Sequence, residues 1–110
     1  MFYKVVFYHP KEGLEEILSS LALLGFGKIG QYDSWSVVTP AKERFRPLTD
    51  SKPAIGTEGE LSSQDLFAVN LQCYESELEA LTQKINELHP FEVPAIEAWA
   101  LAVPTFPRPV

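Results

Sequence analysis

The sequence has only one cysteine, Cys73, and only two histidines among its 110 residues. A single cysteine excludes an internal disulfide and a zinc site built from several cysteines, and it is typical of a reducing compartment. No apolar run approaches the roughly 20 residues that a membrane-spanning helix needs. The first residues carry no basic leader and no long apolar stretch of the kind found in signal peptides. We therefore expect a cytoplasmic protein without a membrane partner.

Positive charge is also scarce, above all in the second half of the chain. The net charge is −6, and residues 56–110 contain two Lys or Arg against nine acidic residues. Acidic surfaces repel phosphate groups, so we expect no nucleic-acid partner. Hydrophobic residues nevertheless make up 45% of the chain and charged residues 22%, which is a globular composition. A chain of this length forms a single domain with one core.

The first third of the chain changes from a strand pattern to a helix pattern. Aromatic and β-branched residues predict a buried strand over residues 2–8. Pro10 suits the first position of a helix, and an apolar stripe from Leu14 to Leu24 predicts that helix. The next segment, residues 29–39, is predicted to be extended.

The last third of the chain repeats this order. Residues 65–73 alternate between two faces, which predicts a strand. Ser76 and Glu79 form a capping-box pattern at the start of a second helix, and His89-Pro90 ends it. Residues 95–103 are predicted to form the last strand.

Between these halves lies a segment that has no clear period. Residues 40–63 contain three prolines and two glycines, and we expect an irregular insert with one short extended piece near Phe45. The proline-rich tail, residues 104–110, is expected to form an extended arm beyond a single domain of residues 1–103.

Two strand–helix–strand units in this order predict an α+β fold, a ferredoxin-like antiparallel sheet with two helices on one face. The core is expected to contain the apolar residues of the inward faces: Tyr3, Val5, Phe7, Leu14, Ile17, Leu18, Leu21, Phe67, Val69, Leu71, Leu78, Leu81, Ile85 and Leu88.

The first strand is apolar on both sides, although helices can cover only one face of the sheet. Phe2, Val6 and Tyr8 lie on the side that the helices leave free. Either the insert or the proline-rich arm folds over this face, or a second subunit covers it. We favour the second alternative and expect a homo-oligomer.

Four motifs, taken together and in order, resemble a known family. They resemble the standalone relatives of the inserted domain of the YqfO proteins, bacterial relatives of yeast NGG-one-interacting factor three, and the last one also resembles the end of CutA proteins. The resemblance implies a PII/CutA-like fold and a trimer. The two-metal site of full-length members lies on flanking domains and does not carry over. The four motifs are Gly25-Phe26-Gly27-Lys28-Ile29-Gly30-Gln31-Tyr32, Phe45-Arg46-Pro47, Pro53-Ala54-Ile55-Gly56 with Gly59-Glu60, and His89-Pro90-Phe91-Glu92-Val93-Pro94-Ala95.

The motif around His89 has a structural and a functional interpretation. In the structural one, the prolines end the helix, and His89 meets the negative end of the helix dipole, which favours an imidazolium. In the functional one, His89 and Glu92 are ligands of a divalent metal ion, together with His9 or residues of a neighbouring chain. The structural interpretation of His9 is a surface or capping residue, and its distance from His89 cannot be obtained from sequence spacing.

Three cations cluster in the irregular insert: Lys42, Arg44 and Arg46. They are either solvent-exposed charges of a loop or charges that protect an edge strand from pairing with other chains. Alternatively, they bind a small anion, as the flexible loop of PII-like proteins suggests. Gly25, Gly27 and Gly30 match the dinucleotide-binding fingerprint formally. They follow a helix instead of opening one, so we interpret them as turn residues. Cys73 is expected to be buried and inert.

Three classes of function remain open from the sequence. The first is a non-enzymatic regulatory or ligand-binding module of the PII/CutA type, and the second is a divalent-metal-binding protein of the CutA type. An enzyme ranks last, because the sequence holds no recognisable catalytic motif and few histidines for acid–base chemistry. No cofactor is expected.

Overall fold

A computed structural model describes residues 1–106 and contains four strands and two helices. In chain order they are β1 (Phe2–His9), α1 (Leu14–Leu23), β2 (Val37–Phe45), β3 (Ser62–Tyr74), α2 (Glu75–Leu88) and β4 (Ile96–Leu101). The predicted arm over 104–110 is only partly described, because residues 107–110 lie outside the described residues. No helix within residues 1–106 is long and apolar enough to cross a bilayer.

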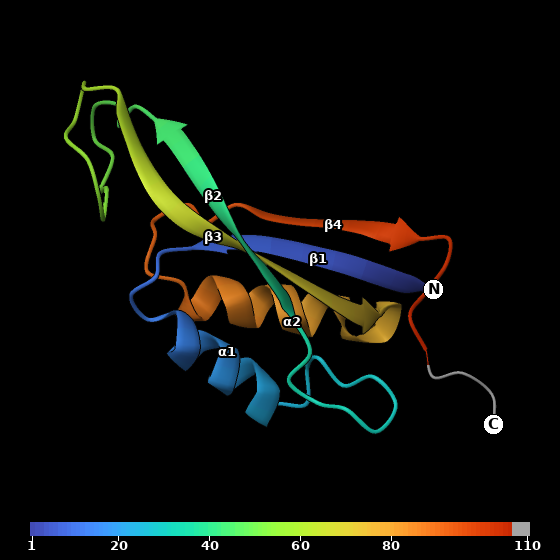
Figure 1. The fold of residues 1–110 in the computed structure, drawn as a ribbon. Coiled ribbons are helices and arrows are strands. Elements are labelled where there is room, and N and C mark those ends of the chain that lie inside the picture. Colours follow the sequence, from blue (N-terminus) through green and yellow to red (C-terminus); the bar gives the residue numbers. More distant parts are fainter. Residues whose placement is uncertain (107–110) are drawn as a thin grey trace.

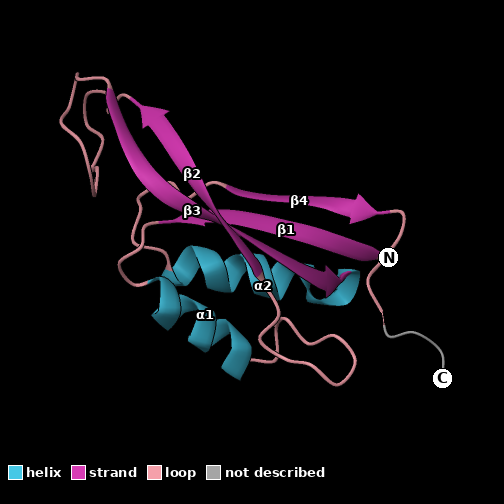
Figure 2. Ribbon diagram, viewed as in Figure 1, coloured by secondary structure: helices cyan, strands magenta, loops and turns pink. Residues whose placement is uncertain are grey.

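The four strands form one antiparallel sheet in the order β2-β3-β1-β4, and both helices cover the same face of it (Figures 1 and 2). The two central strands, β1 and β3, are joined to the outer strands through strand–helix–strand connections and a hairpin. This is the predicted α+β ferredoxin-like arrangement, and the structure confirms it.

The core lies between the sheet and the helices. Val5 and Phe7 of β1 face the helices and are completely buried, as are Leu81 and Ile85 of α2. Most of the predicted core is therefore confirmed. Leu88 is the exception, because it lies in the last turn of α2 and is 41% exposed.

Both helices begin at positions that differ from the predicted ones. Helix α1 starts at Leu14 instead of Pro10, because Gly13 has a φ of +80°, which is incompatible with a helical residue. Helix α2 starts directly after β3, with Tyr74 as its N-cap residue. The backbone N–H of Tyr74 donates a hydrogen bond of 3.0 Å to Glu77 Oε1. The predicted Ser76 and Glu79 pair therefore lies inside the helix.

The irregular insert is shorter than predicted. Residues 40–45 belong to β2, and β3 begins at Ser62, so only residues 46–61 are irregular. Conversely, most of the predicted extended segment 29–39 is loop, apart from a bridge between Ile29 and Tyr32. Pro40 argued against a strand at this position, because proline is rare in strands other than edge strands. β2 is an edge strand and therefore accommodates Pro40.

The β2–β3 hairpin projects beyond the rest of the sheet. Residues 62–66 of β3 pair only with β2, since β1 pairs with β3 from Phe67 onward. The molecule is consequently elongated, at 57 × 25 × 23 Å (Figure 1). Its radius of gyration is 15.5 Å, against about 13 Å expected for a compact domain of this size.

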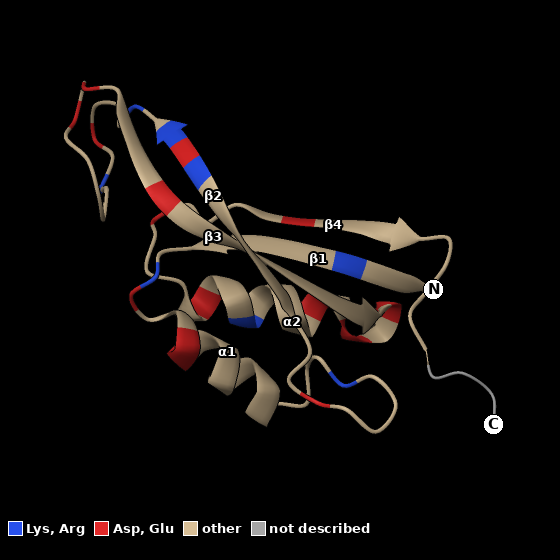
Figure 3. Ribbon diagram, in the orientation of Figure 1, with Lys and Arg blue, Asp and Glu red and all other residues tan. Residues whose placement is uncertain are grey.

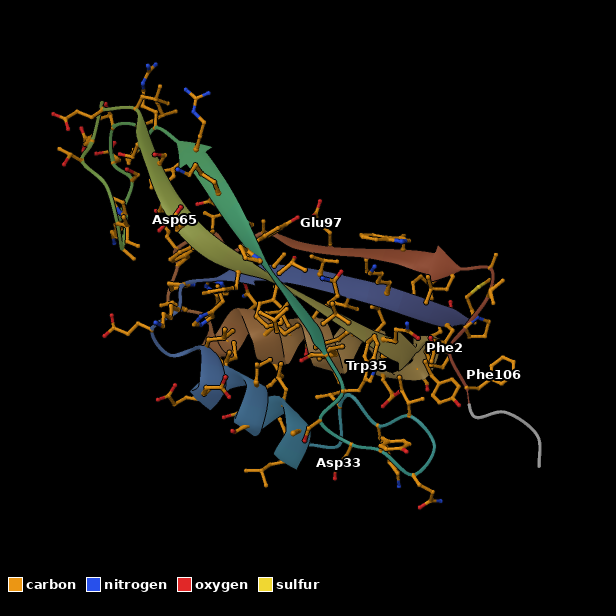
Figure 4. All side chains as sticks on the ribbon, in the orientation of Figure 1. Phe2, Asp33, Trp35, Asp65, Glu97 and Phe106 are labelled. Atoms are coloured by element: carbon orange, nitrogen blue, oxygen red, sulfur yellow. The ribbon has the colours of Figure 1, made fainter. Side chains whose placement is uncertain are left out.

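The free face of the sheet is more polar than the first strand suggested. Lys4 lies on it, with its ammonium 5.8 Å from the centre of the Trp99 ring. Tyr8 donates a hydrogen bond of 2.9 Å to Glu97, which Figure 4 labels on β4. Val6 is only 5% exposed within one chain. The arm touches this region through a long hydrogen bond of 3.4 Å from the Thr105 N–H to Gln72, but Phe106 is 66% exposed.

Truncation of a core leucine tests this packing. We expect Leu21→Ala or Leu81→Ala to lower the free energy of unfolding by about 2–5 kcal/mol, because each side chain is almost fully buried and leaves a cavity. Leu23→Ala is the matched control, since Leu23 lies on the same helix as Leu21 but is 89% exposed and should change stability by less than about 0.5 kcal/mol. Denaturant unfolding measures all three, and equal losses would contradict the assigned core.

Candidate functional site

Two histidines from distant parts of the chain lie side by side in the fold. His9 ends β1, and His89 follows the last residue of α2. Each is followed by a proline, which stops its element at the same end of the sheet. The two ring centres are 5.0 Å apart, and the side chains are only 2% and 7% exposed. We call them the histidine pair.

Hydrogen bonds fix the protonation of the His89 ring. Its Nε2 lies 2.6 Å from the carbonyl oxygen of Tyr8, so Nε2 carries the proton and donates it. Its Nδ1 accepts a hydrogen bond from the backbone N–H of Phe91 at 3.1 Å. The ring is therefore neutral, and both of its nitrogens have protein partners.

The surroundings of His89 favour this neutral form. Burial lowers the pKa of His89 below its ordinary value, and the nearby His9 lowers it further, against the opposite effects of the Tyr8 carbonyl and the Glu43 carboxylate. The expected imidazolium at the helix end is therefore wrong. The surface position expected for His9 is wrong as well, because β1 continues to His9 and its ring packs against His89.

The third residue of the predicted metal site points elsewhere. Glu92 Oε1 accepts a hydrogen bond of 2.8 Å from the backbone N–H of Lys52, in the loop between β2 and β3. Within residues 1–106, no group of three or more His, Cys, Asp or Glu side chains is arranged to hold a metal ion. The donors of one chain thus do not fit a complete metal site, and a site at His9, His89 and Glu92 would need ligands from a second chain.

The bond between Glu92 and Lys52 joins the two walls of a groove of about 420 Å³. One wall is the far end of the β2–β3 hairpin with its loop, including Arg44, Arg46 and Ile55. The other wall is the linker between α2 and β4, where Phe91 and Glu92 follow the histidine pair. His89 holds this second wall through its bond to the Phe91 N–H.

The three predicted cations do not act as one cluster. Lys42 pairs with Asp65 on the neighbouring strand at 3.7 Å, and both side chains are largely exposed. Arg44 and Arg46 line the groove instead and form no ion pair with the described residues. Figure 3 shows the basic residues at the far end of β2, beside a loop that carries acidic ones.

Sequence reasoning did not find the polar pair near the loop end of this hairpin. Gln64 and Glu43 face each other across the two strands, and Gln64 Nε2 donates to Glu43 Oε1 at 2.8 Å. Gln64 Oε1 is a buried side-chain oxygen without a partner in the part of the chain that the structure describes. Only the strand register brings these residues together, and the sequence pattern did not place β2 here.

Two further candidates have structural roles. Burial raises the pKa of the Cys73 thiol to about 11, so the thiol is protonated at neutral pH. Gly27 has a φ of +86°, and a Cβ atom there would lie 2.9 Å from the Trp35 carbonyl oxygen. This glycine permits the close turn after α1, as expected.

Comparisons with known proteins connect the chain to one family and one fold. No protein-family model matches it. It is 30% identical over 96 residues to a GTP cyclohydrolase 1 type 2 homolog of Staphylococcus epidermidis, covering 87% of this chain and 26% of that protein. A homolog of the same name from Listeria innocua is 30% identical over 104 residues, covering 94% and 28%. The chain thus spans about a quarter of the length of these relatives.

Solved structures show the same fold. A Bacillus cereus protein related to NIF3 matches 93% of this chain with 26% of its own, at a TM-score of 0.78 and 22% identity. The periplasmic divalent cation tolerance protein CutA of Archaeoglobus fulgidus matches 96% of this chain with 88% of its own, at 0.71 and 16%. The PII-like protein CutA of Nostoc matches 91% with 81%, at 0.68 and 19%.

The neutral state of His89 predicts how stability depends on pH. The pKa of His89 is lower in the folded than in the unfolded chain. The stability that the neutral His89 contributes is therefore complete above about pH 6.5, the unfolded pKa, and is lost as the pH falls below that value. The slope that one group contributes is at most about 1.4 kcal/mol per pH unit.

Two measurements check this expectation. An NMR titration should give His89 a midpoint below pH 6.5 while the fold persists. Denaturant unfolding between pH 7.5 and 5 should show a smaller loss of stability for His89→Gln than for the unchanged protein. An equal loss in both proteins would contradict the assignment.

Proposed function

We propose that this chain, which is related to one segment of the NIF3/YqfO family and has the PII/CutA-like fold, is a small non-enzymatic module that binds an anionic ligand. The observation that carries the proposal is the groove between the β2–β3 hairpin and the α2–β4 linker. Arg44 and Arg46 are among its lining residues, and neither has an ion-pair partner in residues 1–106.

The groove is lined by two arginines and two glutamates, and the support for an anionic ligand comes from which of these groups already have a partner. Both carboxylates that line it already accept hydrogen bonds, Glu43 from Gln64 and Glu92 from the Lys52 N–H. The arginines therefore provide the donors that are free for a ligand, and a guanidinium binds carboxylate or phosphate groups in a two-pronged geometry. Lys42 lies two residues before Arg44 on β2 and forms an ion pair with Asp65.

The side chains with chemical reactivity support a binding function over an enzymatic one. The Cys73 thiol is protonated at neutral pH, which removes its nucleophilic form. Both nitrogens of His89 are engaged with the backbone, so this imidazole is not free to transfer a proton to a substrate. The relatives' name refers to proteins about four times as long as the matched segment, and their activity is not carried over here.

Divalent-metal binding is the second candidate, and one observation favours it: His9 and His89 lie within 5.0 Å of each other, ring centre to ring centre. A metal would have to displace the bonds of His89 to the Tyr8 carbonyl or the Phe91 N–H. Calorimetric titration with Zn²⁺ or Cu²⁺ separates this candidate from the anion site, since His9→Gln should abolish metal binding and leave anion binding in place, because His9 does not line the groove.

We also propose that the chain associates with itself through the free sheet face, as a trimer. Trp99 and Tyr74 support this, because they lie on that face and are 47% and 60% exposed. Aromatic side chains are enriched at protein interfaces relative to the rest of the surface. Val6 is less informative, because it is already buried within one chain.

Anion binding is tested with inorganic phosphate and NMR. Phosphate should shift the backbone amide signals of residues 44–46, and the double variant Arg44→Gln with Arg46→Gln should lose these shifts, because it removes both guanidinium groups. The control Lys11→Gln with Lys28→Gln removes two exposed charges outside the groove and should keep them. Equal loss in both variants would indicate a non-specific charge effect and contradict the proposed site.

Self-association is tested by light scattering at micromolar concentration. A trimer has about three times the chain mass of 12.3 kDa. Trp99→Glu should reduce the mass to that of one chain, because a carboxylate buried in the interface without a partner is costly. Leu23→Glu, on α1 and 89% exposed, should leave the mass unchanged. A mass near 12.3 kDa for the unchanged protein would refute the oligomer.

A further inference from the structure

We infer that the groove takes an organic anion whose body is apolar, such as an aromatic carboxylate, and not a small inorganic anion. This inference rests on the proposed anion site and adds the class of ligand. It follows from what surrounds the two arginines, from the hydrogen bonds that hold the walls of the groove and from its size.

Most of the groove surface is apolar. Phe45, Pro47 and Ile55 line the hairpin wall, and Phe91 and Val93 line the linker wall. Several of these side chains remain open to solvent, with Ile55 42% and Val93 81% exposed. A small hydrated anion would leave this surface in water, whereas an apolar ligand body would cover it and gain the hydrophobic contribution.

Hydrogen bonds of the protein itself hold the two walls of the groove together. Glu92 ties the linker to the loop through the Lys52 N–H, and the Gly59 N–H donates to the Pro47 carbonyl at 2.7 Å, which closes the loop on itself. Gly56, with a φ of +96°, lets the loop pass over the Phe45 ring, since a Cβ there would lie 3.0 Å from that ring. A preformed site loses less conformational entropy when it binds a small rigid ligand.

The size of the groove agrees with this class of ligand. Its volume of about 420 Å³ lies within the range of small-molecule sites. Its lining combines two arginines with apolar residues from both walls, so a ligand that carries one anionic group on a flat apolar body can use both kinds of contact.

Three probes separate charge from apolar body: indole-3-acetate carries both, acetate carries the charge alone, and indole-3-acetamide carries the body alone. We expect indole-3-acetate to bind at least about tenfold more tightly than either of the others, because it alone uses both parts of the groove. NMR titration of the full chain gives the three dissociation constants and locates the shifted amides.

Two variants tie the binding to the groove. Ile55→Ser should weaken indole-3-acetate binding about three- to tenfold, since it removes apolar contact, and should leave the phosphate-induced shifts of residues 44–46 unchanged. Leu23→Ser is the matched control, because it also removes an exposed apolar side chain, but on α1, outside the groove. The double arginine variant should weaken the binding of both phosphate and indole-3-acetate.

The outcomes keep the inference distinct from the proposed function. Equal affinity for indole-3-acetate and acetate, with phosphate still bound at residues 44–46, would overturn the inference and leave a simple anion site. Equal affinity for indole-3-acetate and its amide would overturn it as well, because the charge would then have no role. If neither phosphate nor indole-3-acetate binds, the proposed function fails together with the inference.

Discussion

The pairing of β3 with two different partners is the constraint on which the rest of the structure depends. β3 is 13 residues long; residues 67–74 pair with β1 over the core, while residues 62–66 pair only with β2. Backbone hydrogen bonds of a single strand thus connect the packed body to the projecting hairpin. The hairpin places Arg44 away from the core, where a charged side chain avoids the cost of burial, and beside the linker that follows α2.

The histidine pair fixes the other side of the groove. A linker from a helix on one face of the sheet to the edge strand β4 must pass the end of β1, and its polar backbone needs partners there. His89 bonds to the Tyr8 carbonyl on one side and to the Phe91 N–H on the other, so the ring is a bridge between β1 and the linker. Replacing His89 would leave both backbone groups without this partner, so the role that the structure assigns to it is structural.

Sequence reasoning predicted the fold well, because periodicity reports burial on one face and does not require tertiary information. The strand at residues 2–8, both helices and the alternating strand before Cys73 follow from such periods. It failed at β2, since this edge strand is exposed and contains Pro40, so neither alternation nor composition marks it. Of the site, it found Arg44 and Arg46 as cations. It missed Gln64, Glu43 and the contact of His9 with His89, because these depend on strand register and on packing between distant segments.

The distribution of partnered and unpartnered polar groups argues for recognition as the purpose of this surface. The buried His89 and the less buried Glu43 and Glu92 are all engaged by the protein itself, whereas the buried Gln64 Oε1 has no partner within residues 1–106. A group whose hydrogen-bonding capacity is already used contributes shape and rigidity and is not free to react. Arg44 and Arg46 differ from these residues, because they are exposed, lie at a preformed apolar groove and have no ion-pair partner within residues 1–106. This distribution is the reason for the proposal that the protein holds the walls of the groove and that Arg44 and Arg46 contact a ligand.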